Sequence, residues 1–296
     1  MDVTHQLVSI FVEIDDFCKQ LENYENNFDS FLLSKPSAAR GPKRGLSDSE
    51  IATILIAFHS IRFRDFKTFY LFLKKYFHNY FPALPSYQRF VELIKYALFP
   101  VVLFLQFRKG KQTGIYYIDS TALPVCLLKR SRRHKTFDNI AEYGKTSVGW
   151  FFGLKLHIVI NETGQLMAFK ITKGNVHDAK AAEPLLSKFK GVAFGDKGYL
   201  GKKLFEKLFE NGLKLITRKR KNMKEKINLN AFEQQLLNQR NIIETVIDHL
   251  KNHYQIWHSR HRSIFNAFVH LLAGLAAYSI EPLRLYAIKS LEETPN

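Results

Sequence analysis

The chain has 296 residues, of which 46% are hydrophobic and 24% charged, so it can bury enough apolar surface to fold into about two domains, and extended disorder is excluded. Lys and Arg total 44 against 27 Asp and Glu, a formal net charge of +17 that favours a polyanionic partner such as nucleic acid. With only Cys18 and Cys126 present, neither a disulfide framework nor a Cys-rich zinc site can form, and a reducing compartment is expected.

Residues 1–108 are predicted to be a helical domain. Apolar residues recur every three or four positions over 3–23, which predicts an amphipathic helix. Ser47 and Glu50 form a capping-box pattern ahead of a second helix, and a further helical pattern follows Ser86. Short helices of this kind either read DNA as a helix-turn-helix unit or only pack against each other, and the sequence leaves both possibilities open.

From residue 109 onward the pattern changes to that of a mixed α/β domain, which we expect to span 109–296. Three segments rich in β-branched and aromatic residues predict an antiparallel meander, at 114–126, 148–160 and 165–174. A helix, a short strand, a second helix and another strand follow, and then a long helix over 231–257. This order is the plan of a ribonuclease H-like mixed sheet with helices packed against it.

Two carboxylates stand at the ends of predicted strands. Asp119 follows the apolar run 115–118, and Asp196 ends the strand VAFGD. A carboxylate is costly to bury at such a position unless it binds a metal ion or a hydrogen-bond donor, for instance Thr121. If the two strands are neighbours, the carboxylates lie side by side. Mg²⁺ prefers such oxygen ligands, and two of these ions can activate an attacking oxygen and stabilise a leaving one.

A third carboxylate is expected from the long helix 231–257. Its residues Arg240, Glu244 and Lys251 are separated by four and seven positions, so they fall within about 40° of one another on one helix face. An ordinary Arg–Glu ion pair beside an exposed Lys would have the same spacing. The apolar Ile247 in the same sector argues against a fully solvated face.

With these residues in place, the sequence resembles the DDE transposases of bacterial insertion sequences, most closely the IS982 family. In the related groups the first Asp follows an apolar strand, as in YYIDST here, and the second precedes Gly-Tyr, as in GDKGY. The third carboxylate lies in the signature Tyr-x2-Arg-x3-Glu-x6-Lys. Arg240, Glu244 and Lys251 match the last three members of this signature, and Leu237 replaces the Tyr.

The resemblance implies a transposase with a ribonuclease H-like domain that binds two Mg²⁺ or Mn²⁺ ions through Asp119, Asp196 and Glu244. Water would attack the phosphodiester at a transposon end, and the released 3′-OH would then attack target DNA. The implied partners are double-stranded DNA, as terminal inverted repeats and target, and a second copy of the chain in a homodimer on DNA. The segment GNVHDAK resembles one common in these enzymes, so His177 and Asp178 are expected near the site, with Asp178 as a helix N-cap rather than a catalytic group.

Two dense basic segments, at 129–135 and 218–226, flank the predicted strands of the acidic site. Like charges at this density repel each other unless a polyanion binds them, so we expect contact with DNA, with a solvated loop as the alternative. The predicted DNA-contact residues are Lys129, Arg130, Arg132, Arg133, Lys135, Arg218, Lys219, Arg220, Lys221, Arg240 and Lys251.

Two other functions stay open from the sequence: a different ribonuclease H-like DNA nuclease of the resolvase type, and a basic DNA-binding protein without catalytic activity. The nuclease would share the acidic residues but lack strand joining, and the plain binder would not need them. The N-terminus does not resemble a signal peptide, and the apolar stretch 267–280, interrupted by His270, is shorter than the roughly 18–20 residues of a membrane span. We therefore expect a cytoplasmic protein without a membrane partner, and the resemblance to insertion-sequence transposases implies a bacterial source.

Overall fold

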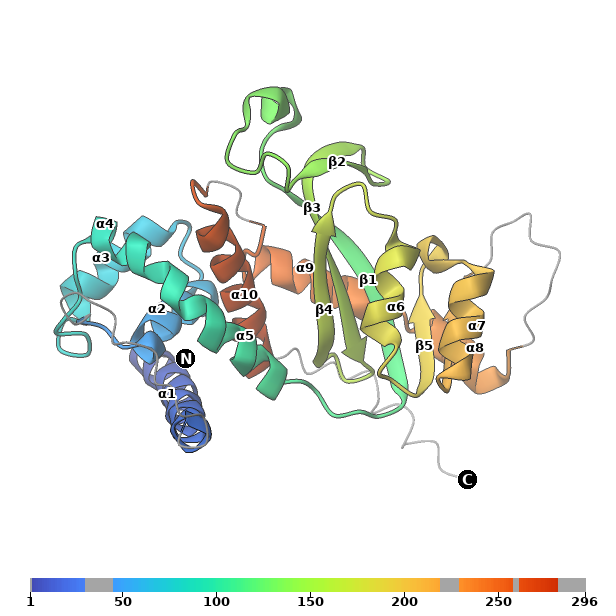
Figure 1. The fold of residues 1–296 in the computed structure, drawn as a ribbon, viewed down its shortest axis with the longest axis horizontal. Coiled ribbons are helices and arrows are strands. Elements are labelled where there is room, and N and C mark those ends of the chain that lie inside the picture. The colour runs from blue at the N-terminus through green and yellow to red at the C-terminus, as the bar shows by residue number, and fades with distance from the viewer. Residues whose placement is uncertain (1, 30–44, 219–228, 258–260, 282–296) are drawn as a thin grey trace. The chain divides into compact units, whose positions relative to one another are not determined.

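The computed structural model describes residues 2–29, 45–218, 229–257 and 261–281. The chain forms two compact units: a helical unit, made of the part up to Arg108 together with 253–256 and 261–280, and a unit built around a β-sheet. The two units are described separately, and their elements are labelled in Figure 1.

The helical unit consists of packed helices, as the apolar periodicity predicts. Its elements are α1 (Val3–Asp29), α2 (Asp48–Ile61), α3 (Phe66–Tyr76), α4 (Tyr87–Leu93), η1 (Ile94–Ala97), α5 (Leu98–Phe107) and α10 (Ile264–Ile280). The predicted capping box starts α2: the Glu50 N–H donates to Ser47 Oγ over 3.1 Å, and the Ser47 N–H donates to the Glu50 carboxylate over 2.7 Å. The stretch Tyr87–Phe107 has the length and hydropathy of a membrane-crossing helix, and 44% of its most apolar window is buried in the structure.

Helix α10 belongs to this helical unit, which differs from the expectation that all residues after 108 form part of the catalytic domain. It packs against α2 and α5, and nearly all of its side chains from Val269 to Ser279 are buried. The helix is apolar on every side because other helices surround it. Periodicity shows that such a helix is buried but does not show against which partners.

The second unit is a six-stranded mixed sheet. Its strands are β1 (Ile115–Pro124), β2 (Glu142–Lys145), β3 (Trp150–Asn161), β4 (Leu166–Lys173), β5 (Gly191–Gly195) and β6 (Leu213–Thr217). Their order is β2-β3-β1-β5-β6, with β4 also paired to β3. Strands β1, β3 and β4 form the predicted antiparallel meander, and β5 and β6 run parallel to β1. The sheet therefore has the ribonuclease H-like plan that the sequence predicts.

Helices cover both faces of this sheet (Figure 1). The elements are α6 (Asp178–Leu186), α7 (Lys202–Glu210), α8 (Ala231–Asn238) and α9 (Asn241–Asn252). Tyr116 and Ile118 of β1 pack in one core with buried leucines of α6 and α7. The intervening Tyr117 points to the opposite face, because side chains alternate along a strand, and donates its hydroxyl to the Leu236 carbonyl of α8 over 3.4 Å.

Two local features differ from the sequence prediction. The four-residue strand β2 is not among the elements predicted from the sequence, and the predicted helix 231–257 is divided by a turn at Gln239 and Arg240. The buried residues Leu236 of α8 and Ile243 of α9 are seven positions apart, which is also the spacing of about two turns of a continuous helix. A periodic pattern therefore gives no sign that the backbone turns there.

Candidate active site

Asp119 and Asp196 lie where the parallel pairing of two neighbouring strands, β1 and β5, ends. The parallel pairing of β1 with β5 ends at Ile118 and Gly195. Asp119 is the next residue of β1, which continues to Pro124, and Asp196 directly follows the last residue of β5. The expectation that these strands are neighbours is therefore confirmed. Asp196 is exposed, and its side chain does not cap η3 (Lys197–Tyr199), the short helix that follows it.

The Asp119 carboxylate is largely buried, with 21% of its side chain exposed. Burial raises the pKa of Asp119 to about 6. The Ser120 N–H, which donates to Asp119 Oδ1 over 2.8 Å, and the Arg240 charge both oppose this rise, whereas the negative charges of Asp196 and Glu244 add to it. The expected hydrogen-bond donor thus exists, but it is the backbone of Ser120 and not Thr121. Asp119 therefore interacts electrostatically with both Asp196 and Glu244.

Arg240 joins two of these carboxylates. Its Nη2 atom lies 2.5 Å from Glu244 Oε1, and its Nη1 atom lies 3.5 Å from Asp119 Oδ2. Glu244, in the first turn of α9, has 53% of its side chain exposed, while Arg240 is only 6% exposed as a residue. The structure therefore shows Arg240 as a buried counter-ion of two carboxylates, whereas the sequence analysis expects it among the DNA-contact residues.

Lys251, near the end of α9, lies partly buried beside the same group. Its Nζ atom is 5.3 Å from the centre of the Trp257 ring, a cation–π arrangement. Burial lowers the pKa of Lys251, and the negative charges of Asp248 and Asp119 partly offset that effect. Lys251 is thus close enough to Asp119 for their charges to interact.

The donor chemistry of these residues suits a hard divalent cation. Carboxylate oxygens are the ligands that Mg²⁺ and Mn²⁺ prefer, and a cation would offset the negative charges of Asp196 and Glu244, which add to the effect of burial on the pKa of Asp119. In the part of the chain that the structure describes, no three acidic, His or Cys side chains stand close enough together to chelate one ion as they are arranged. The Arg240 guanidinium balances part of the negative charge in this arrangement.

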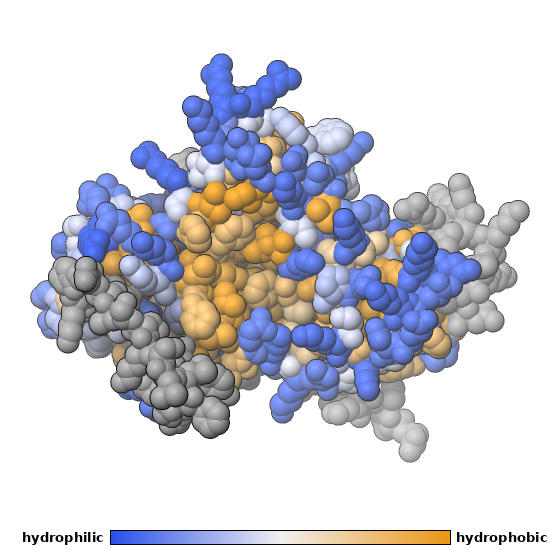
Figure 2. Space-filling model, viewed as in Figure 1, coloured by the Kyte–Doolittle hydropathy of each residue, from blue (hydrophilic) through white to orange (hydrophobic). Residues whose placement is uncertain are grey.

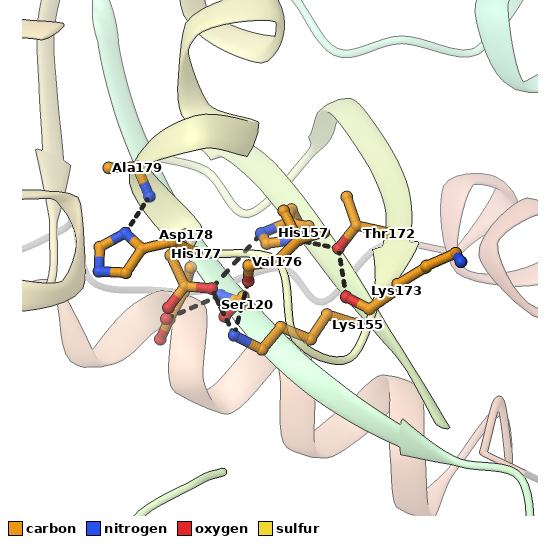
Figure 3. A network of polar contacts seen from close by, with 10 residues as sticks. Ser120, Lys155, His157, Thr172, Lys173, Val176, His177, Asp178 and Ala179 are labelled. Atoms are coloured by element: carbon orange, nitrogen blue, oxygen red, sulfur yellow. Dashed lines mark hydrogen bonds and ion pairs between the residues drawn. The ribbon is translucent and has the colours of Figure 1, made fainter. Parts of the chain in front are cut away.

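The N-cap of α6 is His177, whereas the sequence predicts Asp178 in that role (Figure 3). His177 is the N-cap of α6, and its Nδ1 atom accepts from the Ala179 N–H over 3.3 Å. Asp178 is the first residue of the helix, and its carboxylate accepts from Ser120 Oγ and Lys155 Nζ, each over 3.1 Å. The prediction of Asp178 as N-cap is wrong because its side chain points to the sheet.

Ser120, Lys155 and His157 of this network were not identified from the sequence. They are polar residues within strands that are otherwise buried, and that interruption is the one signal the sequence offers. Ser120 pairs with His157 across β1 and β3, so both side chains share a face of the sheet. Their common partner on α6 follows only from the folded arrangement.

The first basic segment lies on the connection between β1 and β2, around η2 (Leu128–Arg133). All five of its predicted DNA-contact residues are exposed, as is Arg218 at the end of β6. Hydrophilic side chains dominate the surface of this connection, at the top of Figure 2. The predicted contacts at Lys219, Arg220 and Lys221 lie outside the described residues.

A comparison with protein families identifies the sheet unit. A family model described as "Transposase DDE domain" matches residues 109–264, more than half of the chain. No curated protein is significantly similar in sequence. Among solved structures, the chain is similar to a piggyBac transposase synaptic complex with hairpin DNA, at 11% identity over 94% of this chain and 74% of that one, with a TM-score of 0.48. It is also similar to the Mos1 mariner paired end complex with Mn, at 12% identity over 90% and 88% of the two chains, with a TM-score of 0.27. The family match shows that this chain belongs to the DDE transposases, enzymes that act on DNA and use divalent metal ions.

Proposed function

We propose that Asp119, Asp196 and Glu244 are the catalytic carboxylates of this transposase and that together they hold two Mg²⁺ or Mn²⁺ ions. The observation that carries the proposal is that Asp119 and Asp196 each follow the last paired residue of two adjacent parallel strands. Arg240 contacts both Asp119 and Glu244, and so joins the third carboxylate to them. When bound, such ions lower the pKa of an attacking water and neutralise charge on the reacting phosphate.

The reaction is hydrolysis of the phosphodiester at a transposon end, followed by attack of the released 3′-OH on target DNA. Because the pKa of Asp119 is about 6, most of this carboxylate is ionised near pH 7 and has its oxygens available as ligands. Arg240 compensates two carboxylates and has the planar donor set that binds phosphate oxygens in pairs. Its position within the acidic group therefore suits contact with the scissile phosphate.

The exposed cations around η2 and at Arg218 bind phosphates of the DNA that lie beyond the acidic site. Their exposure supports this role, because a cation with its charge in solvent is free to replace counter-ions on DNA. Lys251, beside Trp257, adds a cation close to Asp119. Sequence-independent contacts of this kind fix the DNA on the enzyme without reading its bases.

We further infer that the protein is a transposase of the IS982 family of bacterial insertion sequences and acts on DNA as a homodimer in the cytoplasm. The supporting observations are the sequences YYIDST and GDKGY and the spacing of Arg240, Glu244 and Lys251. A dimer follows from the need to hold two transposon ends at once.

A cleavage and joining assay tests this function. The full chain is incubated in Mg²⁺ or in EDTA with a DNA duplex. This duplex carries one end of the mobile element that contains the coding sequence of the protein. The expected result is a Mg²⁺-dependent nick with a free 3′-OH, and joining of that end to a supercoiled plasmid. Cutting without joining would indicate a resolvase-type nuclease.

Alanine variants at Asp119, Asp196 and Glu244 separate catalysis from binding. Each is expected to lose cleavage while retaining affinity for the duplex. The matched control is Glu206→Ala, which removes an exposed carboxylate on α7 whose Lys202 partner lies 3.8 Å away. A non-catalytic DNA-binding protein would bind equally in all four variants and show no cleavage in the wild type, which would refute the proposal.

A further inference from the structure

We propose that Asp178 is a positioning residue, which fixes the segments that carry Asp119 and Asp196 relative to each other, and that it does not bind the metal ions itself. The inference deepens the proposed function and rests on it, since it concerns the geometry of the same carboxylates. The relevant contacts are those of one side chain at the start of α6 (Figure 3).

The first contact links Asp178 to Asp119 through a single residue. Asp119 and Ser120 are consecutive on β1, so their side chains point to opposite faces of the sheet. Ser120 Oγ donates to Asp178 Oδ1 over 3.1 Å on the α6 face, and the Ser120 N–H donates to Asp119 Oδ1 over 2.8 Å. Ser120 therefore makes one hydrogen bond with each carboxylate, and anchoring its side chain also restrains the backbone N–H that orients Asp119.

The second contact links Asp178 to the segment that carries Asp196. Gly198 lies two residues after Asp196, and a Cβ atom placed on Gly198 would be 3.1 Å from Asp178 Oδ2. The carboxylate thus packs directly against the backbone of η3. Asp178 therefore contacts the chain one residue after Asp119 and two residues after Asp196.

The charge of Asp178 is already balanced by protein groups. Lys155 Nζ donates to Asp178 Oδ1 over 3.1 Å and to the Val176 carbonyl over 3.0 Å, and the two charged side chains are only 13% and 25% exposed. Partial burial strengthens such a pair relative to one in open solvent. A carboxylate oxygen that accepts from both a lysine and a serine is a poor candidate for a metal ligand.

His157 completes the network without adding a charge at neutral pH. Its Nδ1 atom is 3.9 Å from Asp178 Oδ1, and its Nε2 atom lies 2.9 Å from Thr172 Oγ1 on β4. Burial lowers the pKa of His157 to about 4, although the charge of Asp178 opposes this shift. The imidazole is therefore neutral at pH 7, and Lys155 is the counter-ion.

Loss of the Asp178 carboxylate removes the anchor of Ser120 and leaves Lys155 without its partner. Asp119 would then keep its ligand atoms but not their fixed orientation. Residues that orient metal ligands typically contribute about 10- to 100-fold to metal affinity. We expect Asp178→Ala to raise the Mn²⁺ concentration for half-saturation about tenfold or more, and saturating metal to restore most of the cleavage rate.

The experiment compares Asp178→Ala, Asp178→Asn and Ser120→Ala with wild type in the full chain. Mn²⁺ binding is measured from the electron paramagnetic resonance signal of the free ion, and amide hydrogen exchange at Ser120 is measured in metal-free protein. Nicking is followed against Mg²⁺ concentration. The control is Glu183→Ala, which removes an acid from the same helix that pairs with Lys207 at the surface.

Asp178→Ala and Ser120→Ala are expected to weaken Mn²⁺ binding and to speed exchange of the residue 120 region, which Glu183→Ala leaves unchanged. Asp178→Asn keeps an oxygen that accepts from Ser120 and should recover part of both effects. Unchanged metal binding and exchange in Asp178→Ala, with or without a lower melting temperature, would overturn the proposal. Binding lost as completely as in Asp119→Ala would also overturn it, because that result identifies a ligand. If wild type binds no Mn²⁺, the proposed function fails, and exchange at Ser120 still reports whether Asp178 anchors β1.

Discussion

Arg240 and Glu244 form the tightest charged contact of the acidic site, with 2.5 Å between Nη2 and Oε1. The guanidinium is buried and the carboxylate is half-exposed, so one partner of the pair lies inside the site and the other at its surface. The other end of the same guanidinium lies 3.5 Å from Asp119. Arg240 therefore partly neutralises a group of carboxylates that would otherwise repel each other.

Removal of Arg240 should raise the pKa of Asp119 above its present value of about 6, because the cation favours the ionised form. The Arg240→Ala variant tests this, with the Asp119 carboxyl carbon titrated by NMR in metal-free protein. Arg240→Lys keeps a charge and should show a smaller rise. An Asp119 titration that is the same in wild type and Arg240→Ala would contradict the assigned contact.

The stability of the metal-free protein should fall as pH rises through about 6. Burial raises the pKa of Asp119 in the folded state, so the folded protein binds this proton more tightly than the unfolded chain does. The stabilising contribution is full below about pH 4 and is lost as Asp119 ionises. A shift of about two pKa units corresponds to roughly 3 kcal/mol.

Asp119→Asn should remove this part of the pH dependence and leave the metal-free protein more stable than wild type at pH 7. Chemical denaturation from pH 4.5 to 8 measures both proteins. Added Mg²⁺ should stabilise wild type mainly above pH 6, where the carboxylate is ionised. Parallel stability curves for the two proteins would show that Asp119 is not the group responsible.

The exposed cations near η2 should contribute to DNA affinity in a salt-dependent manner. Each phosphate contact contributes about 0.9 to the slope of log K against log salt. Arg130→Gln and Arg133→Gln should each lower that slope by about one and leave the metal dependence of nicking unchanged. Lys202→Gln, which changes a cation on α7 with 89% of its side chain exposed, is the control. Equal slopes in all variants would place the DNA elsewhere.

The packing of α10 in the helical unit can be tested at Gly274. A Cβ atom there would lie 2.6 Å from Ile256 Cγ2 and 3.4 Å from the His59 ring. Overpacking a close contact costs about 1–3 kcal/mol, so Gly274→Ala should destabilise the helical unit by that order. Hydrogen exchange measured by mass spectrometry should show faster exchange in α2 and α10. Faster exchange confined to the sheet unit would contradict this packing.

The sequence predicts the acidic site better than it predicts the groups around it. Asp119 and Asp196 each follow a short apolar run, and the ribonuclease H-like order of the predicted elements makes the two strands that carry them neighbours. The partners of Asp178 depend on which residues of β1 and β3 stand opposite each other, and periodicity does not specify that register. A Lys or Ser that interrupts a buried strand signals a polar contact, but its partner lies 23 or 58 positions away.

The most direct test of the three-carboxylate site is diffraction from crystals of the full chain with end DNA and Mn²⁺, recorded to give the anomalous signal of manganese. The account predicts manganese bound by oxygens of Asp119, Asp196 and Glu244, next to a phosphate of the DNA. Manganese bound without Asp119 or Asp196, or a DNA complex whose phosphate lies at ions held by other residues, would contradict it.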